Sequence, residues 1–141
     1  MKREFTKHGL LLGVNVAGYK KLAQSAFDGP ALGQIADFIT VPTYDFHGSW
    51  ERVTGHTAPL QGSGESDSVE ASMNYWIRQG IPAAKLLVGI PFYGQSFTLA
   101  SPAVNRDQAA IGVQARGAGL PGPFTQQAGM LAYFEICPQG I

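Results

Sequence analysis

The fold is decided by the stretch Gly9-Leu10-Leu11-Leu12-Gly13-Val14-Asn15-Val16, a short and mostly aliphatic run bounded by glycine. Such a run predicts a strand that is covered on both faces, and strands of that kind occur in parallel sheets. Two further strand-like runs follow, Asp37-Phe38-Ile39-Thr40-Val41 and Lys85-Leu86-Leu87-Val88-Gly89-Ile90-Pro91. The sequence therefore predicts three buried parallel strands.

Helical segments are expected between these strands. Residues 20–27 and 31–36 each favour a short helical segment, and Asp28-Gly29-Pro30 separates them. A longer helix is predicted from Asp67, which is followed three residues later by Glu70, as in a capping box. On that helix one face carries Val69, Met73, Trp76 and Ile77.

The resulting β-α-β-α-β order favours either an open doubly wound sheet or a (β/α)8 barrel. A full barrel usually needs about 250 residues, so a chain of this length holds under half of one. The remaining segment, residues 101–139, has a different character, with many Gly, Pro, Ala and Gln residues. Its one convincing strand-like run is Met130-Leu131-Ala132-Tyr133-Phe134-Glu135-Ile136.

Composition narrows the range of partners. Ten basic and ten acidic residues among 141 give a formal net charge of zero, so neither nucleic acid nor an anionic membrane surface is an expected partner. The first five residues include an acid and lead into no continuous apolar segment, so no signal peptide is predicted. The longest apolar run, residues 10–17, is far shorter than the roughly 20 residues of a transmembrane helix. A neutral ligand is the better expectation.

The usual metal, phosphate and acyl-transfer motifs are missing from the sequence. The three histidines, His8, His47 and His56, have no ligand-like spacing, and no glycine cluster opens a helix after a strand. No Gly-x-Ser-x-Gly elbow follows a strand either. We therefore expect no metal and no cofactor. The single cysteine, Cys137, cannot form a disulfide within the chain.

The most informative residues follow the second predicted strand. Tyr44 and Asp45 come directly after it, and Trp50 lies five residues further on. Strand carboxyl ends carry function in parallel α/β folds. One interpretation makes the aromatic rings packing residues and Asp45 a turn cap. The other makes them a sugar-binding edge, because aromatic faces stack on pyranose rings while a carboxylate or phenol bonds the polar groups.

Several blocks together resemble animal family 18 chitinases and chitinase-like lectins, in order and spacing across nearly the whole chain. They are Tyr44-Asp45-Phe46-His47-Gly48-Ser49-Trp50-Glu51, Thr54-Gly55-His56, Gly89-Ile90-Pro91-Phe92-Tyr93-Gly94, Pro121-Gly122-Pro123-Phe124-Thr125 and Leu131-Ala132-Tyr133-Phe134-Glu135-Ile136-Cys137. The resemblance implies a partial (β/α)8 TIM barrel whose strands five to seven lie in residues 1–100. It implies that residues 101–141 begin the small α+β insertion domain.

The family hydrolyses N-acetylglucosamine polymers such as chitin by substrate-assisted catalysis, in which the substrate's own N-acetyl carbonyl attacks the anomeric carbon. By resemblance, Tyr44 and Asp45 hold the acetamido group and the reacting sugar. Trp50, Tyr93 and Met130 match positions that line the sugar cleft. The implied role is chitin catabolism, with chitin or chito-oligosaccharides as partners, and the implied location is extracellular.

The sequence also departs from the family pattern. The 141 residues contain no Asp-x-x-Asp-x-Asp-x-Glu motif, whose last residue is the catalytic acid, so this chain alone is predicted to be inactive. Pro42 replaces a usual Met, Gln95 a common sugar-contacting Arg, and Gln127 a frequent cleft Glu. Three alternatives stay open at this point: part of a chitinase, a non-catalytic chitinase-like lectin, or a chain without folded function alone. The sequence contains no indication of an oligomeric state.

Overall fold

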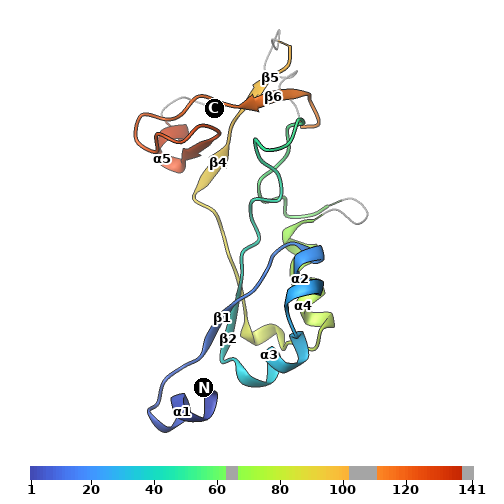
Figure 1. Cartoon of the computed structure of the whole chain (residues 1–141), viewed down its shortest axis with the longest axis vertical. Coiled ribbons are helices and arrows are strands. Elements are labelled where there is room, and N and C mark those ends of the chain that lie inside the picture. Colours follow the sequence, from blue (N-terminus) through green and yellow to red (C-terminus); the bar gives the residue numbers. More distant parts are fainter. Residues whose placement is uncertain (63–66, 102–110, 138–141) are drawn as a thin grey trace. The chain divides into compact units, whose positions relative to one another are not determined.

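The structure is a computed structural model that describes residues 1–62, 67–101 and 111–137 (Figure 1). The chain divides into two compact units, each built from two separate stretches of sequence. The first unit comprises Met1–Tyr44 and Pro59–Ile90, and the second comprises Asp45–Ala58 and Pro91–Ile141.

The first unit contains a three-stranded parallel sheet. Its strands are β1 (Gly13–Asn15), β2 (Phe38–Val41) and β3 (Leu86–Val88), hydrogen-bonded in the order β1-β2-β3. Val14 lies opposite Ile39, which in turn lies opposite Leu86. This sheet confirms the predicted parallel pairing of the three aliphatic runs.

The helices of the first unit are α1 (Lys2–Lys7), α2 (Lys20–Ala26), α3 (Gly29–Ile35), α4 (Val69–Arg78) and the 3-10 turn η1 (Ala83–Lys85). Asp28 caps α3, because its carboxylate accepts a hydrogen bond of 3.0 Å from the amide of Ala31. The predicted cap of α4 was wrong by one residue. Ser68 accepts from the amide of Ala71 at 3.1 Å, whereas Asp67 accepts from the amide of Lys20.

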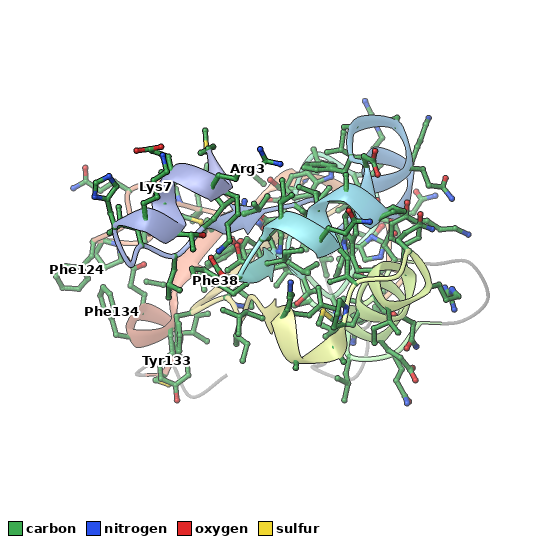
Figure 2. All side chains as sticks on the ribbon, turned by 90° about the horizontal axis from the view of Figure 1, so that it is seen from below. Arg3, Lys7, Phe38, Phe124, Tyr133 and Phe134 are labelled. Atoms are coloured by element: carbon green, nitrogen blue, oxygen red, sulfur yellow. The ribbon has the colours of Figure 1, made fainter. Side chains whose placement is uncertain are left out.

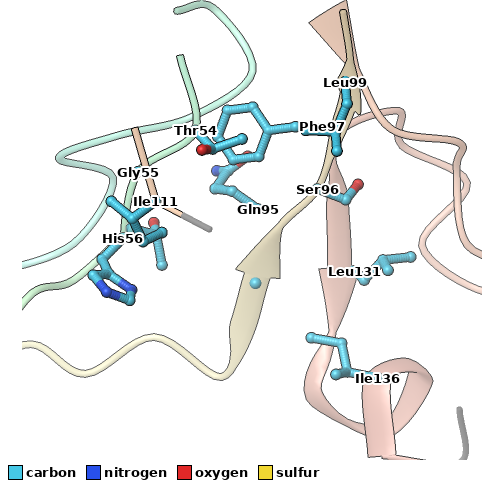
Figure 3. A pocket seen from close by; sticks show the side chains of 12 residues that line it. Thr54, Gly55, His56, Gln95, Ser96, Phe97, Leu99, Ile111, Leu131 and Ile136 are labelled. Carbon is cyan, nitrogen blue, oxygen red and sulfur yellow. The ribbon is translucent and has the colours of Figure 1, made fainter. Parts of the chain in front are cut away.

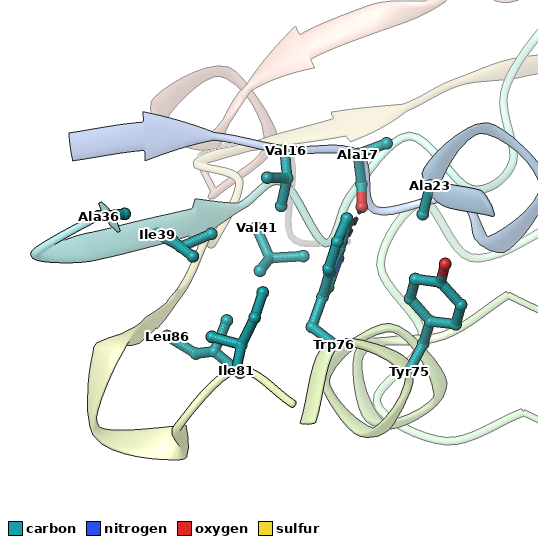
Figure 4. Packing of buried hydrophobic residues seen from close by; sticks show 10 residues of the cluster. All are labelled: Val16, Ala17, Ala23, Ala36, Ile39, Val41, Tyr75, Trp76, Ile81 and Leu86. Carbon is teal, nitrogen blue, oxygen red and sulfur yellow. Dashed lines mark hydrogen bonds between the residues drawn. The ribbon is translucent and has the colours of Figure 1, made fainter. Parts of the chain in front are cut away.

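One face of this sheet is buried against helices α2 and α4 (Figure 4). Trp76 is fully buried there, with its Nε1 donating to the carbonyl oxygen of Ala17 at 3.0 Å. Phe27 and Tyr75 meet the Trp76 ring edge to face, with centroids 5.8 and 5.1 Å away. The buried cluster consists of Val16, Ala17, Ala23, Ala36, Ile39, Val41, Tyr75, Trp76, Ile81 and Leu86.

The prediction that the strands are covered on both faces was wrong for this chain. Asn15 and Leu87, which flank Thr40 in the sheet register, are both exposed. Leu10 and Leu11 precede β1 and are also exposed. Among the described residues, the buried cluster of this unit lies on the helix-covered face, and the exposed side chains point the other way because side chains alternate between the two faces of a strand.

The second unit is built from two short antiparallel pairs. Strand β4 (Tyr93–Gln95) pairs with β7 (Met130–Ala132), and β5 (Phe97–Leu99) pairs with β6 (Ala115–Ala118). An isolated bridge between Val53 and Gln114 joins the segment between β2 and α4 to the residue before β6. Strands β4, β5 and β6 were not predicted from the sequence, because each is only three or four residues long and rich in small or polar residues.

The predicted strand over residues 130–136 was correct only for its first part. β7 ends at Ala132, and α5 (Tyr133–Ile136) follows directly. The carboxylate of Glu135, which is 4% exposed, accepts hydrogen bonds from the amides of Ala132 (2.9 Å), Phe124 (2.8 Å) and Thr125 (3.0 Å). The Thr125 hydroxyl adds a fourth bond at 2.8 Å. These bonds turn the chain back at Ala132 and end the strand.

The wrapping of residues 121–125 around this carboxylate requires a glycine. A Cβ atom on Gly122 would lie 2.3 Å from Oε1 of Glu135, so a larger residue would displace the carboxylate. Beside it, the rings of Phe124 and Phe134 meet edge to face with centroids 5.4 Å apart (Figure 2).

Among the described residues, no helix is both long enough and apolar enough to cross a bilayer.

Candidate functional site

Asp45, the first residue of the second unit, has an unusual backbone conformation. Its φ of 59° lies in the left-handed region, which few residues other than glycine adopt. The Asp45 amide donates to the hydroxyl oxygen of Thr57 at 3.2 Å. The next amide, of Phe46, donates to the carbonyl oxygen of Thr57 at 2.9 Å. Thr57 thus contacts the backbone on both sides of this bend.

The Asp45 carboxylate accepts hydrogen bonds from side chains in distant parts of the sequence. Its Oδ1 accepts hydrogen bonds from the Tyr93 hydroxyl at 2.7 Å, from Nε2 of Gln95 at 3.1 Å and from the Thr57 hydroxyl at 3.4 Å. We call these four residues the Asp45 cluster. Hydrogen bonds to an ionised acceptor are stronger than neutral ones, so they orient the carboxylate.

Met130 and the turn that carries Trp50 lie near the same strands. Met130 is the register partner of Gln95 in the β4–β7 pair. The glycine before it, Gly129, has a φ of +83°, and a Cβ there would lie 2.5 Å from Oγ of Ser49. The Trp50 ring folds back over Gly48, where a Cβ would lie 2.2 Å from it, and is 61% exposed. This places Asp45, Tyr93 and Met130 around one pair of strands, with the 48–50 turn against its edge.

Tyr44 belongs to the first unit, and its ring packs against the end of β3. A Cβ on Gly89 would lie 2.9 Å from the Tyr44 ring.

The backbone contacts of Gly89 also show how Pro42 is tolerated at the end of the central strand β2. The Gly89 amide donates to the carbonyl oxygen of Val41 at 2.8 Å, and the Thr43 hydroxyl donates to the carbonyl oxygen of Gly89 at 2.8 Å. A side-chain hydroxyl thus continues the pairing past the proline, which has no backbone N–H to donate.

An open cavity of about 610 Å³ adjoins the Asp45 cluster within the second unit (Figure 3). Thr57 and Gln95 belong to both the cluster and the cavity wall. Much of the wall is apolar. The lining residues are Thr54, Gly55, His56, Thr57, Gly94, Gln95, Ser96, Phe97, Leu99, Ile111, Leu131 and Ile136.

Thr57 was not among the predicted site residues, and Gln95 was predicted only as a departure from a family pattern. The structure gives Gln95 a contact in the Asp45 cluster. Gln127, the other departure in this unit, is exposed. The sequence did contain one indication of Thr57, because this residue directly follows the Thr54-Gly55-His56 block of the family resemblance.

Within residues 1–62, 67–101 and 111–137, no group of three His, Cys, Asp or Glu side chains could hold a metal ion.

Comparison with known proteins identifies relatives along almost the whole chain. The sequence model of glycosyl hydrolases family 18 matches residues 1–140. Probable chitinase 10 of Drosophila melanogaster is 47% identical over 130 residues, which make up 89% of this chain and 6% of the fly protein.

Two solved structures show the same similarity. The Group IV chitinase of Ostrinia furnacalis, solved in complex with allosamidin, is 39% identical with a TM-score of 0.88, over 98% of this chain and 38% of that one. Human YKL-39, described as a pseudo-chitinase with retained chitooligosaccharide binding, is 38% identical with a TM-score of 0.85, over 97% of this chain and 39% of that one. The chain thus spans less than half the length of each of these relatives.

Proposed function

Since this chain belongs to glycosyl hydrolases family 18, we propose that it forms part of the wall that binds chito-oligosaccharides, and that the intact parent protein hydrolyses chitin by substrate assistance. One observation carries this proposal: the convergence of Thr57, Tyr93 and Gln95 on the carboxylate of Asp45. A carboxylate held by several donors is oriented before a ligand arrives, which lowers the entropic cost of binding.

The proposed roles follow the chemistry of an N-acetylated sugar. The carboxylate of Asp45 accepts a hydrogen bond from the acetamido N–H, and the phenol of Tyr44 bonds the acetamido carbonyl. Oriented in this way, the carbonyl oxygen attacks the anomeric carbon in the parent enzyme. Trp50, Tyr93 and Met130 provide apolar and aromatic surface for the sugar rings.

We further propose that the 141 residues bind sugar without cleaving it. The sequence has no Asp-x-x-Asp-x-Asp-x-Glu motif, whose last residue, by resemblance, is the acid that protonates the leaving oxygen. Binding without hydrolysis has a precedent in human YKL-39, described as a pseudo-chitinase with retained chitooligosaccharide binding. A non-catalytic chitinase-like lectin is therefore the alternative function for the parent protein. Glutamine at positions 95 and 127 is compatible with either a chitinase or a lectin.

A calorimetric titration of the purified chain with tetra-N-acetylchitotetraose tests the binding. We expect saturable binding that Asp45→Asn weakens by about tenfold, the effect of about 1.4 kcal/mol, because asparagine keeps the shape but loses the charge. Asp28→Asn is the matched control, since asparagine also caps helices. An absence of saturable binding, or equal affinity of wild type and Asp45→Asn, would overturn the proposal. In parallel, a chromogenic chito-oligosaccharide should give no turnover above a denatured sample.

The placement of the chain within its parent is also a proposal. We assign β1, β2 and β3 to barrel strands five, six and seven, residues 1–100 to the barrel and residues 101–141 to the start of the α+β insertion domain. The parallel order β1-β2-β3 supports the first assignment. An extracellular location follows from the family resemblance. Transcript sequence upstream of Met1 that encodes a strand ending in the acidic motif would test the assignment directly.

A further inference from the structure

We propose that Thr57 is a positioning residue, which holds Asp45 in its left-handed conformation and thereby aims the carboxylate at the sugar. This inference rests on the proposed function, because it assumes that Asp45 contacts the acetamido group. It adds a residue that acts through Asp45 and that the motif resemblance did not include.

Thr57 contacts two separate parts of Asp45 with a single hydroxyl group. The oxygen accepts the backbone N–H of Asp45 at 3.2 Å, and the hydroxyl hydrogen points to Oδ1 at 3.4 Å. One hydroxyl has both a donor and an acceptor role available, so the two bonds are compatible. Tyr93 and Gln95 donate to the carboxylate, whereas Thr57 also fixes the backbone from which that carboxylate extends.

The left-handed conformation of Asp45 needs such an anchor. Residues with a Cβ atom are disfavoured at positive φ, and aspartate tolerates it better than most because its side chain bonds locally. The Phe46 amide donates to the carbonyl oxygen of Thr57 at 2.9 Å. Phe46 itself is only 5% exposed, so the residue after the bend is fixed by burial as well.

The segment that carries Thr57 is held in place independently of Asp45. The Thr54 amide donates to the carbonyl oxygen of Val113, and the Gly112 amide donates to that of Thr54, both at 2.9 Å. The Val113 amide also donates to the Thr54 hydroxyl at 3.0 Å. These bonds fix the chain three residues before Thr57, so Thr57 has a defined position from which to constrain Asp45.

The test compares Thr57→Val, which keeps the branched shape but removes the hydroxyl, with Thr57→Ser, which keeps the hydroxyl. NMR measures the backbone coupling constant and Cα shift of Asp45, which report its φ, and calorimetry measures affinity for tetra-N-acetylchitotetraose. We expect Thr57→Val to move the Asp45 signals away from the left-handed values and to weaken binding about fivefold, the effect of one typical hydrogen bond. Thr57→Ser should retain both properties.

Thr98→Val is the matched control, because the Thr98 hydroxyl donates to the carbonyl oxygen of Ala118 in the same unit without touching Asp45. It should leave the Asp45 signals and the affinity unchanged. The proposal is overturned if Thr57→Val keeps the left-handed signals, or if those signals move while the affinity does not. If wild type shows no saturable binding, the proposed function fails, and the Asp45 signals alone decide whether Thr57 holds this conformation.

Discussion

The hydroxyl of Tyr93 donates a 2.7 Å hydrogen bond to Oδ1 of Asp45, which lies 48 positions earlier in the sequence. The bond connects strand β4 to the residue at which the second unit begins. Because the acceptor belongs to a carboxylate, this bond is of the stronger, charge-assisted kind. It makes Tyr93 more than an aromatic wall residue, since the phenol also orients the group that is proposed to bind sugar.

Tyr93→Phe removes that hydroxyl and leaves the ring. We expect the affinity for tetra-N-acetylchitotetraose, measured by calorimetry, to fall about tenfold, the effect of about 1.4 kcal/mol from a lost bond to a charged group. Tyr133→Phe provides the control, because Tyr133 is an exposed tyrosine outside the Asp45 cluster. Equal affinities for Tyr93→Phe and wild type would show that the Tyr93 hydroxyl does not contribute to binding.

Gln95→Glu tests the electrostatics of the same cluster. The substitution places a second carboxylate where Nε2 now donates to Asp45 at 3.1 Å, so two negative charges replace a hydrogen bond. We expect a lower melting temperature and weaker sugar binding, both partly restored by salt because screening reduces repulsion. Gln24→Glu, at an exposed position of α2, should change neither property. An unchanged melting temperature for Gln95→Glu would contradict the contact with Asp45.

The aliphatic runs predicted the first unit well. Strands as short as β1 to β3 are recognisable from sequence because their aliphatic residues pack against helices. Trp76, on the apolar face predicted for the longer helix, belongs to the same buried cluster. The sequence did not reveal which face would be covered. Leu10, Leu11 and Leu87 are as aliphatic as buried residues, yet they lie exposed, because coverage depends on which elements pack against the sheet.

The second unit was harder to predict, since its short strands depend on pairing rather than on hydrophobic pattern. Strand β6 has the sequence Ala-Arg-Gly-Ala, which favours no strand, and it pairs with β5 through a register shift at Thr98 and Leu99. Asp45 and Tyr93 were predicted as site residues by resemblance. The contact of Asp45 with Thr57 occurs at a left-handed residue that no local pattern predicts.

Trp76→Phe tests the core of the first unit. The smaller ring cannot donate to the buried carbonyl oxygen of Ala17, so an unsatisfied acceptor remains in the core. We expect a loss of about 1–3 kcal/mol in the free energy of unfolding, measured by urea titration. Ile77→Val, at a neighbouring position of α4 that is 44% exposed, should stay within about 0.5 kcal/mol of wild type. A comparable loss in both variants would contradict the role assigned to the Trp76 hydrogen bond.

The Glu135 carboxylate is expected to make the stability of the second unit depend on pH. Burial by itself raises the pKa of Glu135, but the amides of Ala132, Thr125 and Phe124 and the Thr125 hydroxyl outweigh it and lower the pKa from 4.5 to about 2. A carboxyl group with a lowered folded-state pKa stabilises the folded state fully above its unfolded-state value. That contribution should therefore be present above pH 4.5 and should decline as the pH falls towards 2.

Glu135→Gln removes this titration while keeping the size of the side chain. Hydrogen exchange of the Phe124 and Thr125 amides, followed from pH 7 to pH 2 and corrected for intrinsic exchange, measures the local stability. Protection should be lower in the variant at neutral pH, because an amide nitrogen cannot accept the bonds that the carboxylate accepts. As the pH falls below 4.5, wild type should lose protection and approach the variant. Glu70→Gln, on the exposed side of α4, should follow the wild-type curve. Parallel curves for wild type and Glu135→Gln across this range would show that the ionised carboxylate does not hold residues 124 and 125 in place.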